Sequence, residues 1–388
     1  MRPYLRPSRS RRRRRTPGRC SRRVRSPRSG ARRTEREGGV PCSCRQRYET
    51  DVAAASRPCR DLATGHDEAN TRTPPSSHRP TFRQDDMDVA LLVNPTARAS
   101  ARTNAAEDVA ALLRAHGIRT TLIAGGSAVE STDLLRLALQ AGADAVLVAG
   151  GDGTVNLAAQ ELAGTGIPLG IVPTGTGNDV ATALGLRERD ARGAAEAVAA
   201  GSTRTIDLAR VRRVDGSTSL YATVLASGFD SRVNDRANRM RWPRGHVRYD
   251  LAILIEFLRL RCVAFEVELE HADGTIERRG EELLMATVGN GPTYGGGIPI
   301  CPDADLADGL LDVTLVRPLG RTRLLRLLPR VYRGAHTGLD EVVTARVRRV
   351  RLSAPATTAY ADGDAVGMLP LEIDVVPGAL RVFAPAAR

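Results

Sequence analysis

The chain has 388 residues, with 57 basic and 44 acidic side chains and a formal net charge of +13. This basicity is confined to one end of the sequence. Residues 1–86 contain 23 arginines and 9 acidic residues, whereas residues 87–388 contain 34 arginines and 35 acidic residues. The folded body is therefore nearly neutral, so its composition gives no reason to expect a nucleic-acid partner. Its length is sufficient for two domains.

Residues 1–86 are rich in arginine, proline and serine and lack aliphatic periodicity. Such a segment cannot bury enough apolar surface to offset the entropy lost on ordering, so we predict that it is disordered. Its run Arg11–Arg15 suits nucleic acid or anionic lipid. We favour a simpler interpretation, in which the segment is a misassigned start and translation begins at Met87, directly before the first apolar strand.

Four absences in the sequence narrow the range of possible functions. The chain has no lysine. This excludes a Walker-type loop and a protein-kinase site, because both place a lysine on the phosphates. No apolar run is long enough to span a bilayer, and no apolar segment near the N-terminus resembles a secretory signal. Four of the six cysteines lie in residues 1–86, and Cys262 and Cys301 fit neither a zinc template nor a disulfide scaffold. We therefore expect a cytoplasmic protein.

Residues 87–208 alternate short apolar strands with helical segments, which predicts an α/β domain. Continuous apolar runs separated by helices indicate parallel strands that are buried on both faces, as in a doubly wound α/β unit. We predict strands at 89–95, 120–124, 144–149, 168–172 and 204–208, and helices at 101–116, 131–141, 154–162 and 193–200.

Residues 209–388 have a different pattern, in which apolar and polar residues alternate with period two. This pattern and the hairpin signal Asp273-Gly274 predict a second, mostly antiparallel β domain. We predict strands at 220–226, 265–270, 282–289, 311–316, 345–352 and 371–376, and helices at 249–261 and 322–333.

The strongest chemical signal is Gly150-Gly151-Asp152-Gly153-Thr154-Val155-Asn156, between a predicted buried strand and a helix. Glycines at the carboxyl end of a parallel strand let the backbone approach a phosphate, and the following helix N-terminus presents free N–H groups to the same anion. A purely structural turn is the alternative interpretation. Asp152 argues against it, because a carboxylate in a phosphate-binding turn repels the ligand unless a metal ion lies between them. The segment predicts a site for Mg²⁺ and a nucleotide.

A second loop of the same kind, Pro173-Thr174-Gly175-Thr176-Gly177-Asn178-Asp179, follows the next strand. It offers two glycines, two hydroxyls and an acidic residue. The first strand ends in Asn94-Pro95-Thr96-Ala97-Arg98, where Arg98 provides the cation that no lysine can supply. Neighbouring strands that end in such loops form one crevice, so an accidental match is improbable.

The segments VNP, GGDGTVN and PTGTGND together resemble the diacylglycerol kinase catalytic domain, which bacterial lipid kinases share with sphingosine and ceramide kinases. GGDG alone would also admit NAD kinases, which have the same nucleotide fold. The segments Gly289-Asn290-Gly291, Tyr294–Gly297 and Cys301–Val313 separate the two, because they are similar to the bacterial lipid-kinase β domain. From Met87 to the C-terminus, the resemblance implies a doubly wound NAD-kinase-like nucleotide domain (87–208), followed by an antiparallel β-sandwich-like lipid-substrate domain (209–388).

The resemblance also implies site residues. Asp179 would join a Mg²⁺–water network with Asp152, and a loop would hold a structural Mg²⁺ through Asp305, Asp308 and Leu310, for which an ordinary acidic turn is the alternative. The residues implied for ATP binding are Asn94, Pro95, Thr96, Ala97, Arg98, Gly150, Gly151, Asp152, Gly153, Thr154, Val155, Asn156, Gly175, Thr176 and Asn178.

The sequence departs from the family pattern in three places. The family has Asp-Gly-Glu near the C-terminus with the Glu as general base, whereas here the segment is Ala361-Asp362-Gly363-Asp364, which makes Asp364 the base. Ala97-Arg98 replaces the usual Ser-Gly, and a threonine expected near residues 124–126 is missing.

We therefore predict an ATP-dependent lipid kinase that uses Mg²⁺ to phosphorylate the hydroxyl of diacylglycerol to phosphatidic acid. The alternatives are a kinase for sphingoid or other long-chain alcohols, and a nucleotide-binding protein with impaired catalysis. The lipid partner implies peripheral contact with the inner face of the membrane, and a homodimer is left open. The segment Tyr249–Leu258 is the candidate lipid-facing helix, for which a buried core helix is the alternative.

Overall fold

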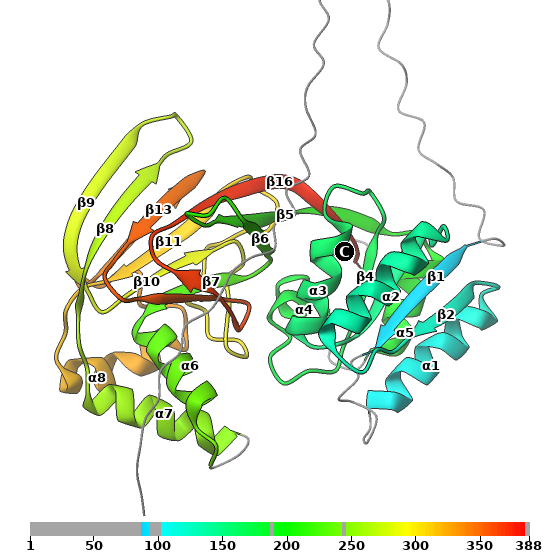
Figure 1. Cartoon of the computed structure of the whole chain (residues 1–388), viewed down its shortest axis with the longest axis horizontal. Helices are drawn as coiled ribbons and strands as arrows, with labels where there is room; N and C mark the ends of the chain where they lie inside the picture. Colours follow the sequence, from blue (N-terminus) through cyan, green and yellow to red (C-terminus); the bar gives the residue numbers. More distant parts are fainter. Residues whose placement is uncertain (1–86, 94–101, 187–189, 243–245, 385–388) are drawn as a thin grey trace, which may run out of the picture. The chain divides into compact units, whose positions relative to one another are not determined.

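The computed structural model describes residues 87–93, 102–186, 190–242 and 246–384, all within one compact unit, Ser77–Arg388. The predicted disordered segment 1–86 and the loop Asn94–Arg98 lie outside these ranges. The described residues form a ten-stranded mixed sheet and a six-stranded antiparallel sheet (Figure 1). The predicted fold class, an α/β part followed by an antiparallel β part, is confirmed.

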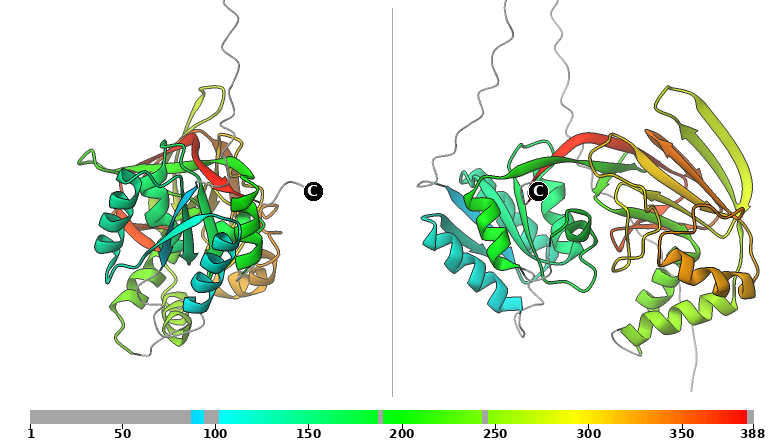
Figure 2. Two further views of the ribbon diagram at one scale, coloured as in Figure 1. Left: turned by 90° about the vertical axis from the view of Figure 1, so that its right-hand side faces the viewer. Right: turned by 180° about the vertical axis from the view of Figure 1, so that it is seen from behind.

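The first part is a parallel sheet in the order β2-β1-β3-β4 with helices on both faces (Figure 2). Alternate residues of the buried strands explain the two layers. Val89 and Leu91 pack with α1 and α5, whereas Ala90 and Leu92 pack with α2 and α3. The elements are β1 (Asp88–Val93), α1 (Arg102–Ala115), β2 (Arg119–Ile123), α2 (Ala128–Gln140), β3 (Ala145–Gly150), α3 (Asp152–Leu162), β4 (Leu169–Pro173), α4 (Asp179–Ala183) and α5 (Ala191–Ala199).

The second part contains the antiparallel strands and three helices. The elements are β5 (Thr203–Arg212), β6 (Thr218–Tyr221), β7 (Val224–Gly228), α6 (Phe229–Arg239), α7 (His246–Leu258), β8 (Val263–Glu270), β9 (Ile276–Leu283), β10 (Met285–Gly289), β11 (Leu311–Val316), α8 (Arg321–Val331), β12 (Val342–Val347), β13 (Arg349–Ser353), β14 (Thr358–Ala361), β15 (Asp364–Met368) and β16 (Leu371–Phe383). None of the helices that the structure describes is both long enough and apolar enough to cross a bilayer.

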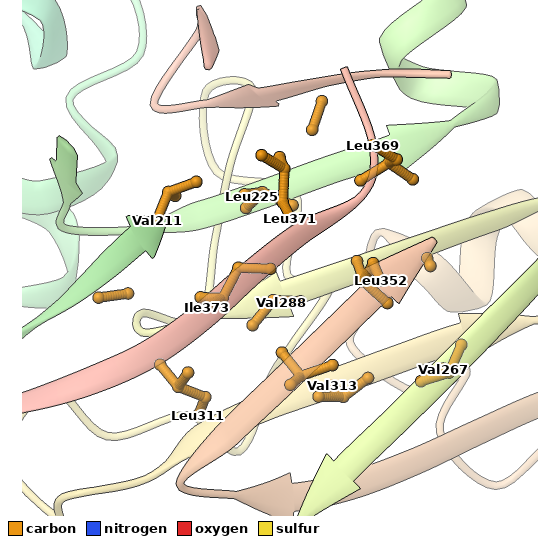
Figure 3. Close-up of a cluster of buried hydrophobic side chains, with 14 of the residues drawn as sticks. Val211, Leu225, Val267, Val288, Leu311, Val313, Leu352, Leu369, Leu371 and Ile373 are labelled. Carbon is orange, nitrogen blue, oxygen red and sulfur yellow. The ribbon is translucent and has the colours of Figure 1, made fainter. Parts of the chain in front are cut away.

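Two sheets pack face to face in this second part. Strands β5, β8, β13 and β16 of the ten-stranded sheet contribute one layer, and β7, β10, β11 and β14 of the six-stranded sheet contribute the other. Figure 3 shows side chains of both layers, among them Val211 and Ile373 opposite Val288 and Val313. Alternating apolar residues on both inner faces are what a β-sandwich core requires.

The C-terminal strand β16 was predicted only to Val376 but runs on to Phe383. It pairs antiparallel with β5 and β13, and its end pairs parallel with β4. The predicted boundary after Leu208 therefore falls inside β5, which continues to Arg212. Because period-two patterning is local, it does not reveal that the last strand returns to the parallel sheet.

The single strand predicted at 220–226 is divided into two strands, β6 and β7, in the structure. The amides of Ala222 and Thr223 donate to the carboxylate of Asp362 at 2.8 and 3.0 Å instead of joining a ladder. Helix α6 was not predicted, because Phe229, Val233 and Ala237 are its only apolar residues and give a weak helical pattern.

Asp207 is a buried carboxylate that joins three segments. Its Oδ1 accepts from the amide of Gly378 at 2.7 Å, and its Oδ2 accepts from the amide of Gly309 at 2.7 Å. Its own amide donates to the carbonyl of Leu306 at 2.6 Å, and its carbonyl accepts from Asn290 Nδ2 at 3.0 Å. β5 is thereby attached to β16 and to the acidic loop before β11.

We expect Asp207→Ala to lower the free energy of unfolding by about 2–4 kcal/mol, because it leaves two backbone amides without their charged acceptor. Denaturant unfolding of the parent and variant measures the difference. Thr205→Ala, an exposed change on the same strand, is the control and should stay within about 0.5 kcal/mol of the parent. Equal stability of Asp207→Ala and the parent would contradict this assignment.

Candidate functional site

The two predicted nucleotide loops follow the neighbouring strands β3 and β4 and pack against each other through glycines. A Cβ built on Gly175 would lie 2.5 Å from the Cα of Gly151, and one built on Gly151 would lie 3.0 Å from the Cα of Gly175. The amide of Thr174 also donates to the carbonyl of Gly150 at 2.9 Å. Side chains at Gly151 and Gly175 would force the loops apart, so loop packing alone requires glycine at both positions.

Asn178 sets the shape of the second loop. Its backbone is left-handed, with φ 58° and ψ 38°, a conformation that asparagine tolerates better than most residues. Its Oδ1 accepts from the amide of Gly175 at 2.9 Å, and its Nδ2 donates to the carbonyl of Gly175 at 3.0 Å. The side chain therefore closes the turn that precedes α4.

Asp152 bridges the two loops. It is the first residue of α3, and its Oδ1 accepts from the amide of Val180 at 3.2 Å. Burial raises the pKa of its carboxyl, and the charge of Asp179 raises it further, although the Val180 hydrogen bond lowers it. A cation at this position would relieve both the desolvation and the repulsion.

The rest of the first loop contains both open and engaged residues. Apart from its chain neighbours and its own helix, no atom lies within 4 Å of a Cβ built on Gly153, so the backbone is accessible there. The side chain of Val155 is buried in the core beneath α3. Asn156 Oδ1 accepts from Gln160 Nε2 at 2.7 Å, and the same nitrogen donates to the carbonyl of Leu220. Of these, Gly153 is the residue open to a ligand.

Three threonine hydroxyls lie in the two loops. The Oγ1 of Thr154 would be 2.8 Å from a Cβ built on Gly150, which explains glycine at that position. Thr176 is exposed, whereas the hydroxyl of Thr174 is buried and has no hydrogen-bond partner among the described residues. Thr176 is therefore the most accessible of the three.

Asp179 links the second loop to the segment between β10 and β11. Its carboxylate is buried and accepts from the amides of Gly296 and Gly297 at 3.0 and 2.8 Å. Both glycines have positive φ, of 86° and 99°, which turns their amides toward the carboxylate at no steric cost. The segment Tyr294–Gly297, which the sequence assigned to the lipid-substrate domain, is thus bonded directly to the nucleotide loop.

The same glycine segment is attached to α6. The hydroxyl of Tyr294 donates to Asp230 Oδ2 at 2.6 Å, and Asp230 belongs to the first turn of α6. Burial raises the pKa of Asp230 to about 6, although the hydrogen bond from Tyr294 and the charge of Arg232 lower it. Hydrogen bonds therefore connect α6, the glycine segment and the nucleotide loop.

Asp362 and Gly363 form the two-residue turn between β14 and β15. Both have positive φ, of 48° and 91°, as type I′ hairpins require. The carboxylate of Asp362 turns back onto the amides of Ala222 and Thr223 and also accepts the Thr223 hydroxyl at 2.5 Å. Burial is the main cause of its raised pKa, and the charge of Asp152 also raises it. Asp362 therefore lies within electrostatic reach of the nucleotide loop.

Asp364, the predicted base, is the first residue of β15. The residue is exposed, and its carboxylate has no hydrogen-bond or ion-pair partner among the described residues. Although the residue is exposed, partial desolvation of its carboxyl raises its pKa. It is thus free to accept a proton, whereas Asp362 is committed to the backbone.

The predicted structural Mg²⁺ loop already holds a positive charge. Asp305 Oδ1 accepts from the amide of Ala307 at 3.0 Å, and Asp308 Oδ1 accepts from the amide of Leu310 at 2.9 Å. The other oxygen of Asp308 pairs with the guanidinium of Arg346 on β12. Within the described ranges, no group of three or more His, Cys, Asp or Glu side chains is placed to hold a metal ion.

A further carboxylate of this loop region, Asp312, has an oxygen that is buried without a hydrogen-bond partner in the described part of the chain. Its Oδ2 lies 3.7 Å from the Nε of Arg346. Burial raises its pKa to about 6; Arg346 lowers it, while Asp308 and Asp303 raise it. The donors are the hard oxygens that Mg²⁺ prefers, and Arg346 competes with a metal ion for them.

The structure brings Asp152 and Asp179 close together and leaves Asp305 and Asp308 in a separate loop, while the predicted Mg²⁺–water network of the first pair stays a prediction. Sequence reasoning missed Asp362, Tyr294 and Arg346 as structural partners of this site. The dipeptide Asp362-Gly363 was a recognisable type I′ turn signal. Nothing local marks Arg346, because its partner lies 38 residues away in the sequence.

Two parts of the chain match protein families. Residues 88–211 match the family described as "Diacylglycerol kinase catalytic domain", and residues 223–384 match "YegS C-terminal NAD kinase beta sandwich-like domain". The resemblance that the motifs predicted is confirmed, and so is the order of an NAD-kinase-like α/β part and a β-sandwich-like part.

Individual relatives agree with these matches. A Mycobacterium tuberculosis (strain CDC 1551 / Oshkosh) protein named "Diacylglycerol kinase" is 48% identical over 297 residues, 76% of this chain and 95% of that protein. A Pseudomonas aeruginosa protein named "Probable lipid kinase YegS-like" is 33% identical over 255 residues, 64% of this chain and 79% of that protein. A crystal structure of a diacylglycerol kinase from Bacillus anthracis str. Sterne has a TM-score of 0.56 at 18% identity, covers 77% of this chain and 97% of that one, and shows the same fold.

Asp230 generates a prediction about pH. Its pKa in the folded protein is about 6, above the ordinary 3.8, so its contribution to stability is present below pH 3.8 and is lost as the pH rises toward 6. Asp230→Asn cannot ionise and keeps an acceptor for Tyr294. We expect the variant to gain stability relative to the parent over this range, by up to about 3 kcal/mol.

Denaturant unfolding at several pH values between 4 and 7 measures this difference. Asp215→Asn is the matched control, because hydrogen bonds from Ser217 lower the pKa of Asp215; its carboxyl is ionised in both states over this range, so its difference from the parent should stay constant. If the parent and Asp230→Asn keep a constant difference across the range, Asp230 does not carry a raised pKa.

Proposed function

Because the chain belongs to the diacylglycerol kinase family, we propose that it transfers the γ-phosphoryl group of ATP to the hydroxyl of diacylglycerol and so forms phosphatidic acid. The observation that carries this proposal is the contact between the two glycine loops, with Asp152 bonded across them. The acceptor lipid is supported by the 48% identical relative named "Diacylglycerol kinase", 95% of which this chain covers. Such a substrate would place the enzyme at the inner face of the membrane.

The nucleotide phosphates would approach the backbone of the first loop and the N-terminus of α3. Gly153 is open there, and the free amides at the start of a helix favour an anion. Thr176, exposed on the second loop, would supply a hydroxyl to a phosphate oxygen. We also retain Asn94, Pro95, Thr96, Ala97 and Arg98 as the third element of the nucleotide site.

Asp152 fits a magnesium ion by its chemistry, since it is a hard oxygen ligand whose pKa burial and Asp179 raise. When bound, Mg²⁺ would neutralise charge on the transferring phosphoryl oxygens. Asp179 would support Asp152 indirectly, since the amides of Gly296 and Gly297 already occupy its carboxylate.

A structural Mg²⁺ at Asp305, Asp308 and Leu310 is the second metal proposal. Asp305 and the carbonyl of Leu310 would be its main ligands, because the guanidinium of Arg346 shares Asp308. Asp312, with one buried oxygen unpartnered in the described part, adds a further hard donor nearby.

Asp364 would accept the proton of the lipid hydroxyl, directly or through one water, as the hydroxyl attacks the phosphoryl group in line. Its carboxylate is uncommitted and its pKa is raised by burial, and both properties suit a general base. Asp362 would position Asp364, because its hydrogen bonds to the backbone before β7 fix the hairpin from which Asp364 projects.

Two other functions remain as alternatives. The first is phosphorylation of a sphingoid or other long-chain alcohol, since relatives such as the Pseudomonas aeruginosa protein are named only as lipid kinases. The second is nucleotide binding with impaired catalysis, which the shorter Asp364 favours. Purified protein with Mg-ATP and a panel of lipid alcohols in mixed micelles distinguishes them by which lipid, if any, is phosphorylated.

Asp152→Asn should lower turnover on diacylglycerol by about a hundredfold or more, because it removes the charge that directs the metal ion without changing the side chain's size. The melting temperature should remain close to that of the parent. Asp133→Asn, an exposed change on α2, is the control and should leave both properties unchanged. Normal turnover of Asp152→Asn with an unchanged Mg²⁺ requirement would remove Asp152 from this role.

Asp364→Ala should also lower turnover by about a hundredfold or more, the usual range for a positioned proton acceptor, while ATP affinity is retained. Asp364→Glu moves the carboxylate by about 1.5 Å, enough to change catalysis, and should be active because it restores the residue that the family has at this position. Asp273→Ala, in the exposed hairpin turn between β8 and β9, is the control. An alanine variant as active as the parent would contradict the assignment. An inactive parent with an active Glu variant would favour impaired catalysis.

A further inference from the structure

Helix α7 has its apolar stripe on the outside. Val247, Leu254 and Leu258 lie on one helical face, and Leu254 is 52% exposed. The opposite face turns toward α6 and contains buried Ala252 and buried Glu256. The alternative that this helix is a buried core helix is therefore wrong. Apolar side chains in such a row remain exposed in soluble proteins chiefly where something else covers them.

Helix α8 extends the same surface. Arg321, its first residue, donates to the carbonyls of Phe257 and Leu258 at 3.2 and 2.7 Å, so the start of α8 caps the end of α7. Leu325 and Leu328 of α8 and the following residue Tyr332 are exposed and share one helical face. The two helices are thus in direct contact, and we refer to their exposed apolar residues together as the apolar surface: Val247, Leu254, Leu258, Leu325, Leu328 and Tyr332.

A basic cavity of about 340 Å³ lies between α6 and α7, which run side by side in Figure 1. Its lining contains Arg232, Arg236, Arg239, Arg259 and Arg261. Their positive charge exceeds that of the two carboxylates in the lining, so the cavity has a net charge that favours an anion.

The two carboxylates account for only some of these arginines. Glu256 pairs with Arg236 and, at 3.7 Å, with Arg232. Asp235 pairs with Arg239 at 3.2 Å. Arg259 and Arg261 are exposed and have no carboxylate partner within the described ranges. Two guanidinium groups are thus available to a ligand at the cavity.

We propose that the cavity between α6 and α7 binds the phosphate of an anionic phospholipid while the apolar surface of α7 and α8 enters the lipid layer. A guanidinium group can bind a phosphate through two parallel hydrogen bonds. Amphipathic helices lie in the membrane interface with their apolar side toward the acyl chains. The purpose of this contact rests on the proposed function: it would keep the enzyme at the membrane that contains its substrate. The binding itself requires neither ATP nor diacylglycerol.

Charge distinguishes this partner from a second copy of the chain. A symmetric dimer through this face would place the same patch against itself and bring like-charged cavities close together. An anionic bilayer instead offers phosphates for the arginines and acyl chains for the apolar residues. Each Arg near such a surface strengthens binding about fivefold.

Trp242 provides a local probe of this surface. It is the single tryptophan of the chain, is 81% exposed, and lies between α6 and α7. The full chain is titrated with vesicles of phosphatidylcholine and with vesicles that also contain phosphatidylglycerol. We expect the Trp242 emission to shift to the blue, and brominated acyl chains to quench it, only with the anionic vesicles.

Variants test the two parts of the surface. In the double variant Arg259→Gln with Arg261→Gln, the lipid concentration that gives half of the emission shift should rise about twenty-five-fold, at fivefold for each arginine. Leu254→Gln should reduce quenching by the brominated chains. The matched controls are Arg192→Gln on α5 and Leu137→Gln on α2, which are equally exposed changes elsewhere and should behave as the parent. The N-terminal 86 residues are the same in every variant.

Three outcomes would overturn the proposal. The first is an unchanged Trp242 emission while the protein sediments with anionic vesicles, because another surface then binds the membrane. The second is competition by inorganic phosphate that abolishes the shift, since the site would then be one for free phosphate. The third is a concentration-dependent shift without vesicles, which would assign the face to a second copy. Because no substrate is present, failure of the proposed reaction would not affect this test.

Discussion

The pairing of β16 with its neighbours holds both parts of the described fold in one sheet. β16 pairs antiparallel with β5 and β13 and parallel with β4 at its end. Its register shifts between Val376 and Leu380, and Asp207 accepts the amide of Gly378 at this bulge. Because a buried carboxylate fixes the bulge, the strand has a defined path from the sandwich to the parallel sheet. The last strand of the chain thereby supports the strands that carry the nucleotide loops.

Three carboxylates around the candidate site are compensated to different degrees. Asp179 and Asp362 each accept two backbone amides at 2.8–3.0 Å, whereas Asp152 accepts the amide of Val180 at 3.2 Å, and the amides of Asn178 and Asp179 also lower its pKa. The charge of Asp179 contributes to the raised pKa of Asp152, and the charge of Asp152 contributes to that of Asp362. Asp152 has the longest of these hydrogen bonds and a raised pKa, so a cation beside it would relieve its desolvation and the repulsion from Asp179.

The basic cavity and the β14–β15 hairpin are joined by a direct contact. Asp235 lines the basic cavity and accepts the hydroxyl of Tyr360 at 2.6 Å. Tyr360 lies on β14, two residues before the Asp362 turn and four before the proposed base Asp364. A ligand phosphate that draws Arg239 away from Asp235 would thus act next to the strand that positions Asp364.

The sequence determined the parts of this protein that depend on local pattern. The strand from 311 to 316 was placed at its observed bounds, and the glycine loops after β3 and β4 were found because strand, glycine turn and helix follow one another along the chain. The motif resemblance led to the family. The nature of α7 remained open, since an apolar helix gives the same pattern whether it lies in a core or on a surface.

Only the tertiary structure decided what depends on residues far apart in the sequence. Asp362 bonds to Ala222 and Thr223 across about 140 positions, Asp179 bonds to Gly296 across 117, and Arg346 pairs with Asp308 across 38. No periodicity encodes such partners, because hydrogen bonds and ion pairs are short-range in space and indifferent to sequence separation. The sequence thus predicted chemical groups for the site, and the fold decided which of those groups the backbone occupies and which remain free.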